Sequence, residues 1–177
     1  MASMSCKVYI VLLMACLPII LGQSPTPSPA ESPKSGPVEN RIMDANELLK
    51  NAGGDHRKAL IANLQAMLVK INQTVTAIDK ALPTLSNKDV ISCVTYARQQ
   101  YTYVTNEILN GIEMVKGIKF VDDGREWNIQ ASAIAGEFTD IKETFDEGAT
   151  FNPFYDENDV LHKMASLNFA LGEGIKV

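Results

Sequence analysis

The side chains that could perform acid–base or metal chemistry are few and widely spaced in this sequence. The two histidines are His56 and His162, and neither belongs to an HExxH motif or accompanies a CxxC pair, the patterns typical of zinc sites. Asp159 and His162 lie three residues apart on one face of a predicted helix, but a di-metal helical bundle requires such a pair twice. We therefore expect neither a metal nor any other cofactor.

Nucleophilic catalysis is also not indicated. The chain has no G-x-S-x-G motif, the turn that exposes the serine of α/β-hydrolases. Cys93 lies on a predicted apolar helix face, and the sequence identifies no histidine beside it that could activate the thiol. Cys6 and Cys16 precede Gly22, in the leader described below, so Cys93 is the odd cysteine of the mature chain. We expect Cys93 to be buried, with a disulfide to another molecule as the alternative, and we expect the protein not to be an enzyme.

Asn72 begins the tripeptide Asn-Gln-Thr, which is an acceptor sequence for N-linked glycosylation. The motif matters only if the chain is secreted and Asn72 is exposed. Because Asn72 follows Ile71 at the edge of a predicted buried face, modification and its absence both stay open at this point.

The first forty residues indicate export followed by an extended spacer. Residues 1–22 carry one cation, Lys7, before an apolar run that ends at Gly22, as in a cleaved signal peptide. A membrane-spanning helix needs roughly 20 apolar residues, and this run is shorter, so we expect no membrane association after cleavage. Residues 23–39 are rich in Ser-Pro and Thr-Pro and predict an extended linker. Residues 40–177 then form a single domain, and the net charge of −5 argues against a nucleic-acid partner.

From residue 40 onward, apolar residues recur at steps of three and four, which predicts helices and no paired strands. A short helix is expected over residues 40–51, followed by four long ones, and the fold is therefore predicted to be an all-α, up-down-up-down four-helix bundle preceded by a short N-terminal helix. The expected boundary residues are Gly53, Gly54, Asp55, Pro83, Ser86, Gly117, Gly148 and Asp156. The residues expected to face the core are Ile61, Leu64, Leu68, Ile71, Val75, Ile78 and Leu82 in the first long helix; Val90, Cys93, Ala97, Tyr101, Val104, Ile108, Ile112 and Val115 in the second; Trp127, Ala131, Ile134, Phe138, Ile141 and Phe145 in the third; and Val160, Met164, Leu167 and Leu171 in the fourth.

From about Asp55 to the C-terminus, the chain resembles the plant invertase and pectin methylesterase inhibitors, which are secreted four-helix bundles preceded by a helical hairpin. The family's third bundle region, with a Cys followed by a Tyr and apolar heptads, is similar to DVISCVTYARQQYTYVTNEI from Asp89. The next helix resembles SAIAGEFTDIKETFDEG from Ser132, and the last resembles NPFYDENDVLHKMASLNFAL from Asn152. The family normally has a disulfide between the second and third bundle helices. Here Ile141 occupies the second cysteine position, where it is expected to pack against Cys93.

Residues 118–124, IKFVDDG, resemble the Pro-Lys-Phe loop of invertase inhibitors, which is also followed by an acidic pair and Gly and which enters the target's active site. Invertases cleave sucrose with two carboxyl groups in a narrow pocket. The resemblance implies that Lys119 pairs with these acids and that Phe120 fills the apolar part of the sugar site. Ile118 replaces the family's proline, so the loop loses a fixed φ. The structural alternative is a linker in which Phe120 only covers the end of the bundle.

The resemblance implies a monomeric, secreted inhibitor that occludes the active site of an acid invertase from the cell wall or vacuole. The expected location is extracellular, in the apoplast or cell wall, with the vacuole as the alternative. One alternative function is inhibition of a pectin methylesterase, with the second to fourth bundle helices covering the target's cleft. Another is an inactive relative acting as a cell-wall interaction protein, because the family's N-terminal hairpin is reduced here to residues 40–51 without cysteine. A carrier of a small apolar ligand is a third.

Overall fold

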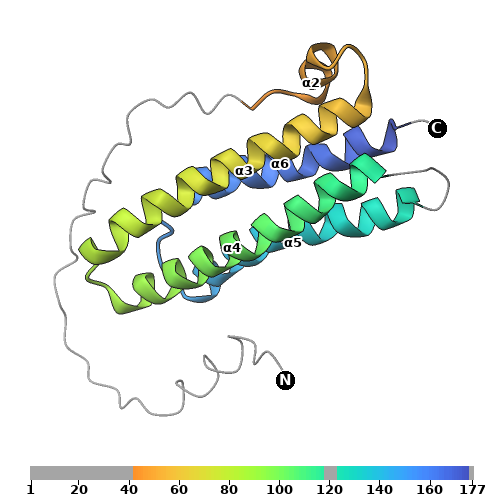
Figure 1. Ribbon diagram of the computed structural model, residues 1–177. Helices are drawn as coiled ribbons and strands as arrows, with labels where there is room; N and C mark the ends of the chain where they lie inside the picture. The colour runs from red at the N-terminus through yellow and green to blue at the C-terminus, as the bar shows by residue number, and fades with distance from the viewer. Residues whose placement is uncertain (1–41, 118–122, 176–177) are drawn as a thin grey trace, which may run out of the picture. The chain divides into compact units, whose positions relative to one another are not determined.

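The computed structural model describes residues 42–117 and 123–175, and within these ranges the chain forms an all-α bundle without strands (Figure 1). The elements are α2 (Ala45–Asn51), α3 (His56–Ala81), a short 3₁₀ turn (Leu82–Thr84), α4 (Lys88–Gly117), α5 (Asp123–Glu147) and α6 (Tyr155–Glu173). Each long helix packs against two others, α3 and α5 both contacting α4 and α6, while α2 packs against α3 and α6. The predicted fold class is confirmed. The predicted leader and linker, residues 1–22 and 23–39, lie outside the described residues.

The starts of the helices follow from short polar side chains that accept hydrogen bonds from otherwise unpaired backbone N–H groups. Asp44 accepts from the N–H of Glu47 at 2.8 Å, so the first helix begins at Ala45 and not at residue 40. Asp55 caps α3 as predicted.

Two predicted caps were wrong. Asn87, not Ser86, lies at the start of α4, where it accepts from the N–H groups of Asp89 and Val90. Asp156 lies within the first turn of α6, since the helix begins at Tyr155.

Two helices end in the same hydrogen-bonded arrangement, a Schellman motif, in which the first residue after the C-cap is in the left-handed region. After α2 that residue is Gly53, with φ of 67°, as the sequence predicts. After α5 it is Ala149, with φ of 46°, and the N–H groups of Ala149 and Thr150 donate to Asp146 and Phe145. The preceding Gly148 has a different role, because a Cβ there would lie 3.2 Å from Sγ of Cys93.

Ala149→Gly is expected to raise the free energy of unfolding by about 1 kcal/mol, because the left-handed conformation strains every residue with a Cβ. Chemical denaturation of the two proteins measures the difference. Ala52→Gly is the matched control, since Ala52 is the C-cap of α2 with a negative φ of −86°. The control variant should not be more stable than the parent. An equal gain in the free energy of unfolding at both positions would contradict the explanation by left-handed strain.

The core lies between the four long helices. In α4 and α5 all the predicted core residues are buried except Val90, which is half-buried. In α3 the predicted Leu64, Ile71 and Ile78 are buried, whereas Ile61, Leu68, Val75 and Leu82 are only partly buried. In α6 the predicted Leu171 is buried, whereas Val160, Met164 and Leu167 are only partly buried. The true core faces of these helices carry polar residues, namely Asn63 and Thr74 in α3 and Asn158 and Asn168 in α6. The apolar pattern therefore included partly buried neighbouring residues and left out these polar core positions.

Candidate target-binding site

The residues predicted to contact a target, Ile118, Lys119 and Phe120, lie outside the described residues. The residues that flank them are described: α4 ends at Gly117 and α5 begins at Asp123. The end of α4, the start of α5, the end of α6 and the start of α3 lie together (Figure 1). We call this region the proximal end of the bundle.

Trp127 joins three helices at the proximal end. Its side chain is 2% exposed, and its Nε1–H donates to the carbonyl oxygen of Asn168 in α6 at 3.2 Å. On the α4 side, a Cβ at Gly111 would lie 3.4 Å from Cζ3 of the indole. On the α6 side, a Cβ at Gly172 would overlap the indole ring. The first turns of α5 are therefore held against α4 and α6, because Gly111 and Gly172 leave space for the indole ring.

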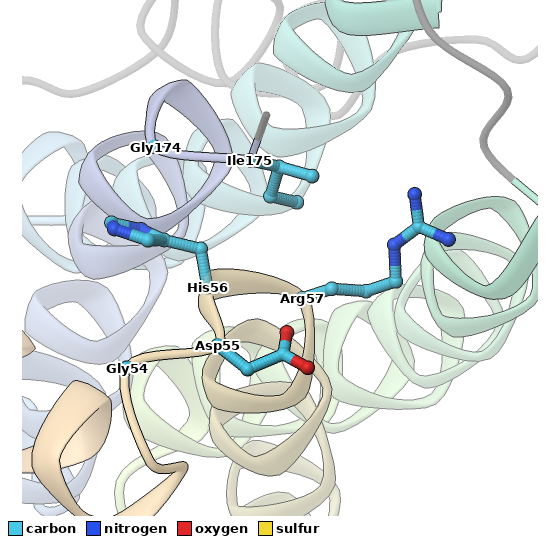
Figure 2. Close-up of a pocket in the computed structure, with 6 residues that line it drawn as sticks. All are labelled: Gly54, Asp55, His56, Arg57, Gly174 and Ile175. Carbon is cyan, nitrogen blue, oxygen red and sulfur yellow. The ribbon is translucent and has the colours of Figure 1, made fainter. Parts of the chain in front are cut away.

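His56 holds the start of α3 against the end of α6. Its Nδ1 lies 3.3 Å from the carbonyl oxygen of Leu171, close enough to donate a hydrogen bond to one of the last carbonyls of the helix. The imidazole faces the chain at Gly174 (Figure 2), where any Cβ would overlap the ring. His56 is thus a structural residue of this end, on the evidence of its contacts.

A cavity of about 660 Å³ opens at the proximal end, lined by Gly54, Asp55, His56, Arg57, Gly174 and Ile175 (Figure 2). Arg57 extends to the opposite side of the helix start from His56. The Asp55 carboxylate accepts the N–H of Lys58, which holds the pKa of Asp55 below its usual value. The cavity is thus rimmed by an ionised carboxylate, a guanidinium and an imidazole, groups that suit polar contacts with a protein surface.

A second hollow, of about 260 Å³, lies between α5 and α6; we call it the α5–α6 groove. It is lined by Phe138, Thr139, Lys142, Tyr155, Asn158, Asp159 and His162. Asp159 forms an ion pair with Lys163, one turn further along the helix, while His162 is exposed. In the part of the chain that the structure describes, no group of three or more His, Cys, Asp or Glu residues is placed to hold a metal.

The outer face shared by α4 and α5 gathers negative charge. Desolvation, Asp140 and Glu107 raise the pKa of the Glu137 carboxyl, whose Oε2 is buried without a hydrogen-bond partner. Glu107 also accepts a hydrogen bond from Nε2 of Gln130 at 2.7 Å and raises the pKa of Tyr103. The ionised form of Glu137 is therefore disfavoured in the folded state.

Glu137→Gln is expected to stabilise the fold at pH 7 by a few tenths of a kcal/mol, an effect kept small by solvent screening. A raised carboxyl pKa means that the native state binds more protons than the unfolded state, so stability falls as pH rises through that interval. The gain should vanish below about pH 4, where the unfolded carboxyl is also protonated. Chemical denaturation at pH 7 and below about pH 4 measures this gain in stability. Glu143→Gln, on the exposed face of α5, is the control. A gain that persists at low pH would mean that charge is not its cause.

The remaining predicted residues lie apart from the proximal end. Cys93 is buried at 8% exposure beside Thr144 of α5 and Gly148, which follows that helix, as the apolar pattern predicts. Asn72 is exposed on α3. Ile141 is fully buried in α5. Within the described ranges, no helix is long and apolar enough to span a bilayer.

Sequence reasoning missed His56, the two glycines against Trp127 and the buried asparagines. The glycines carried a signal, because Gly111 and Gly172 interrupt helical patterns where glycine costs about 1 kcal/mol relative to alanine. The asparagines carried another, since Asn63 and Asn168 fall at steps of three and four from apolar neighbours. Comparison of the chain with protein-family models, with curated proteins and with solved structures found no match.

Proposed function

We propose that this chain is a secreted inhibitor of a carbohydrate-active enzyme, and that its first target is an acid invertase. The proposal combines the resemblance of residues 118–124 to an inhibitor loop with one observation, the anchoring of both flanking helices by Trp127. Fixed helix ends restrict the conformations of any segment that joins them, and this restriction lowers the entropic cost of binding. The proposed role needs no catalytic group. It needs only helix ends held in place and a contact surface complementary to the target's pocket.

In the proposed complex, Lys119 is the cation that meets the two carboxyl groups of the invertase pocket, and Phe120 is the apolar anchor. A carboxylate pair offers a lysine short, charge-assisted hydrogen bonds in a site from which water is excluded. A buried aromatic anchor near the centre of an interface commonly contributes 2 kcal/mol or more. Occlusion of the substrate pocket, with no chemical step, is then the mechanism.

Lys119→Ala and Phe120→Ala are each expected to raise the inhibition constant for acid invertase by about 30-fold, which is about 2 kcal/mol per residue. The measurement is a titration of invertase activity with the purified full chain, with circular dichroism to show unchanged helicity. Tyr155→Ala, in the α5–α6 groove, is the matched control, because it removes an exposed aromatic ring at the start of α6, whereas the end of α6 lies at the proximal end. Equal inhibition by the parent and by both loop variants would remove the loop from the mechanism.

The second candidate is inhibition of a pectin methylesterase, and the observation in its favour is the α5–α6 groove. The exposed aromatic side chain of Tyr155 lines this groove together with Lys142 and His162. The same titration against a pectin methylesterase separates the candidates. For that target Tyr155→Ala and Lys142→Ala should weaken inhibition, whereas the Lys119 and Phe120 variants should act like the parent.

A further inference from the structure

The glycosylation motif at Asn72 occupies an unusual place in the fold. It is the one Asn-x-Ser/Thr tripeptide in the sequence, and it lies in the middle of α3, a continuous helix of 26 residues. Asn72 and Gln73 are exposed, although the neighbouring Ile71 is 2% exposed. The helix therefore presents the acceptor amide to solvent, which meets the condition of exposure.

The third residue of the motif is hidden in the folded chain. Thr74 is 1% exposed, and its hydroxyl donates to the carbonyl oxygen of Lys70 at 3.0 Å. The Asn72 carbonyl also accepts from the hydroxyl of Thr76 at 2.8 Å, as expected within a regular helical turn. An enzyme that must read both the amide of Asn72 and the hydroxyl of Thr74 cannot reach the second group while α3 is folded.

We propose that Asn72 carries an N-linked glycan and that the glycan is attached before α3 folds. The donor is an oligosaccharide linked to a lipid diphosphate. A bond forms between Nδ2 of Asn72 and C1 of the first sugar, the bond from C1 to the diphosphate oxygen breaks, and the amide loses one proton as the lipid diphosphate leaves. The inference rests on the secretion that the proposed function requires, and on no other part of it.

The folded bundle accommodates such a glycan without obstructing the proximal end. Asn72 is sixteen residues beyond His56, which places it about 24 Å along α3 at 1.5 Å per residue. Val69, one turn before Asn72, is 60% exposed, so the first sugars can cover part of an exposed apolar side chain. Modification at this position is therefore compatible with target binding at the proximal end.

The first test is the mass of the full chain produced in a eukaryotic secreting cell behind a host secretion leader. One glycan is expected, removed by peptide N-glycosidase with conversion of residue 72 to aspartate. Asn72→Gln and Thr74→Val should both lack it, and Thr74→Val separates loss of the motif from loss of the asparagine. Secreted full chain without a glycan would overturn the proposal. Because the leader is supplied by the host, this failure would differ from failure of the chain's own export or of inhibition.

The second test concerns the order of events. Full chain made in bacteria, folded and unmodified, is incubated with solubilised oligosaccharide transferase and its lipid-linked donor. It should gain less than a tenth of the glycan gained by Ala77→Pro, a full-length variant that keeps the motif but breaks α3. Circular dichroism verifies that one protein is folded and the other is not. Equal modification of both would overturn the requirement for an unfolded acceptor.

Discussion

Gly172→Ala is expected to lower the free energy of unfolding by about 3 kcal/mol, combining overpacking with the loss of a buried hydrogen bond. A Cβ at this position would overlap the indole of Trp127, a large ring that is 2% exposed and cannot move outward without leaving the core. If the ring moves, its Nε1–H also loses the carbonyl oxygen of Asn168, 3.2 Å away. Thermal and chemical denaturation, followed by circular dichroism, measure the loss.

Gly136→Ala is the matched control for that prediction. Gly136 lies within α5, and a Cβ there would have no atom within 4 Å. Alanine removes backbone freedom from the unfolded chain at no steric cost, so this change should stabilise the protein by 0.5 to about 1 kcal/mol. The same substitution in two helices is therefore expected to have opposite signs. Destabilisation of both would indicate that glycine is needed for helix flexibility, and would contradict the steric explanation.

The contrast between α5 and α6 shows what the sequence could predict. In α5 the core positions from Trp127 to Phe145 are apolar, so the period of the pattern identified them. In α6 two of the core positions are Asn158 and Asn168, and the apolar residues beside them produced a false face. Hydrogen bonds from other helices make these amides acceptable in the core, and those partners are brought together only by the tertiary fold.

The candidate site divides in the same way. The sequence identified Gly117 as a helix end, because that is a local feature. The role of residues 118–124, which was inferred from resemblance, stays a prediction. The sequence could not identify Trp127 as the residue that joins α5 to its neighbours, because that role depends on the approach of Gly111 and Gly172 from two other helices. It could not assign a role to His56 either, because the carbonyl oxygen of Leu171 is 115 residues away in the chain. Contacts of this kind depend on how the helices are paired.

A pair of buried asparagines supplies the second large expected effect. Nδ2 of Asn63 in α3 donates to the side-chain oxygen of Asn168 in α6 at 2.8 Å and to the carbonyl oxygen of Met164 at 2.9 Å. Nδ2 of Asn168 lies 3.6 Å from Sδ of Met67. The two asparagines are 2% and 0% exposed, so neither can replace a lost partner with bulk water.

Asn63→Leu is expected to cost about 2 to 3 kcal/mol, because it leaves the side-chain oxygen of Asn168 buried without its donor. Asn168→Leu should cost less, about 1 to 2 kcal/mol, since Asn63 keeps the Met164 carbonyl as an acceptor. The double variant should cost less than the sum of the two, with a coupling of about 1 kcal/mol or more, because no orphaned amide remains. Chemical denaturation of the parent, the two single variants and the double variant completes this double-mutant cycle.

The exposed Asn128→Leu in α5 is the control for the change of side chain itself, and a surface position of this kind should shift stability by less than about 0.5 kcal/mol. Additive costs at Asn63 and Asn168 would mean that the amides are satisfied independently, and the hydrogen bond between them would then contribute nothing to the pairing of α3 with α6. Positive coupling would show that this pair opposes rotation of α6 about its axis. Such a rotation would bring the half-buried Met164 and Leu167 to the core and would carry Gly172 away from Trp127. The asparagine pair and Trp127 would then both hold α6 in one rotational position, at two different points along the helix.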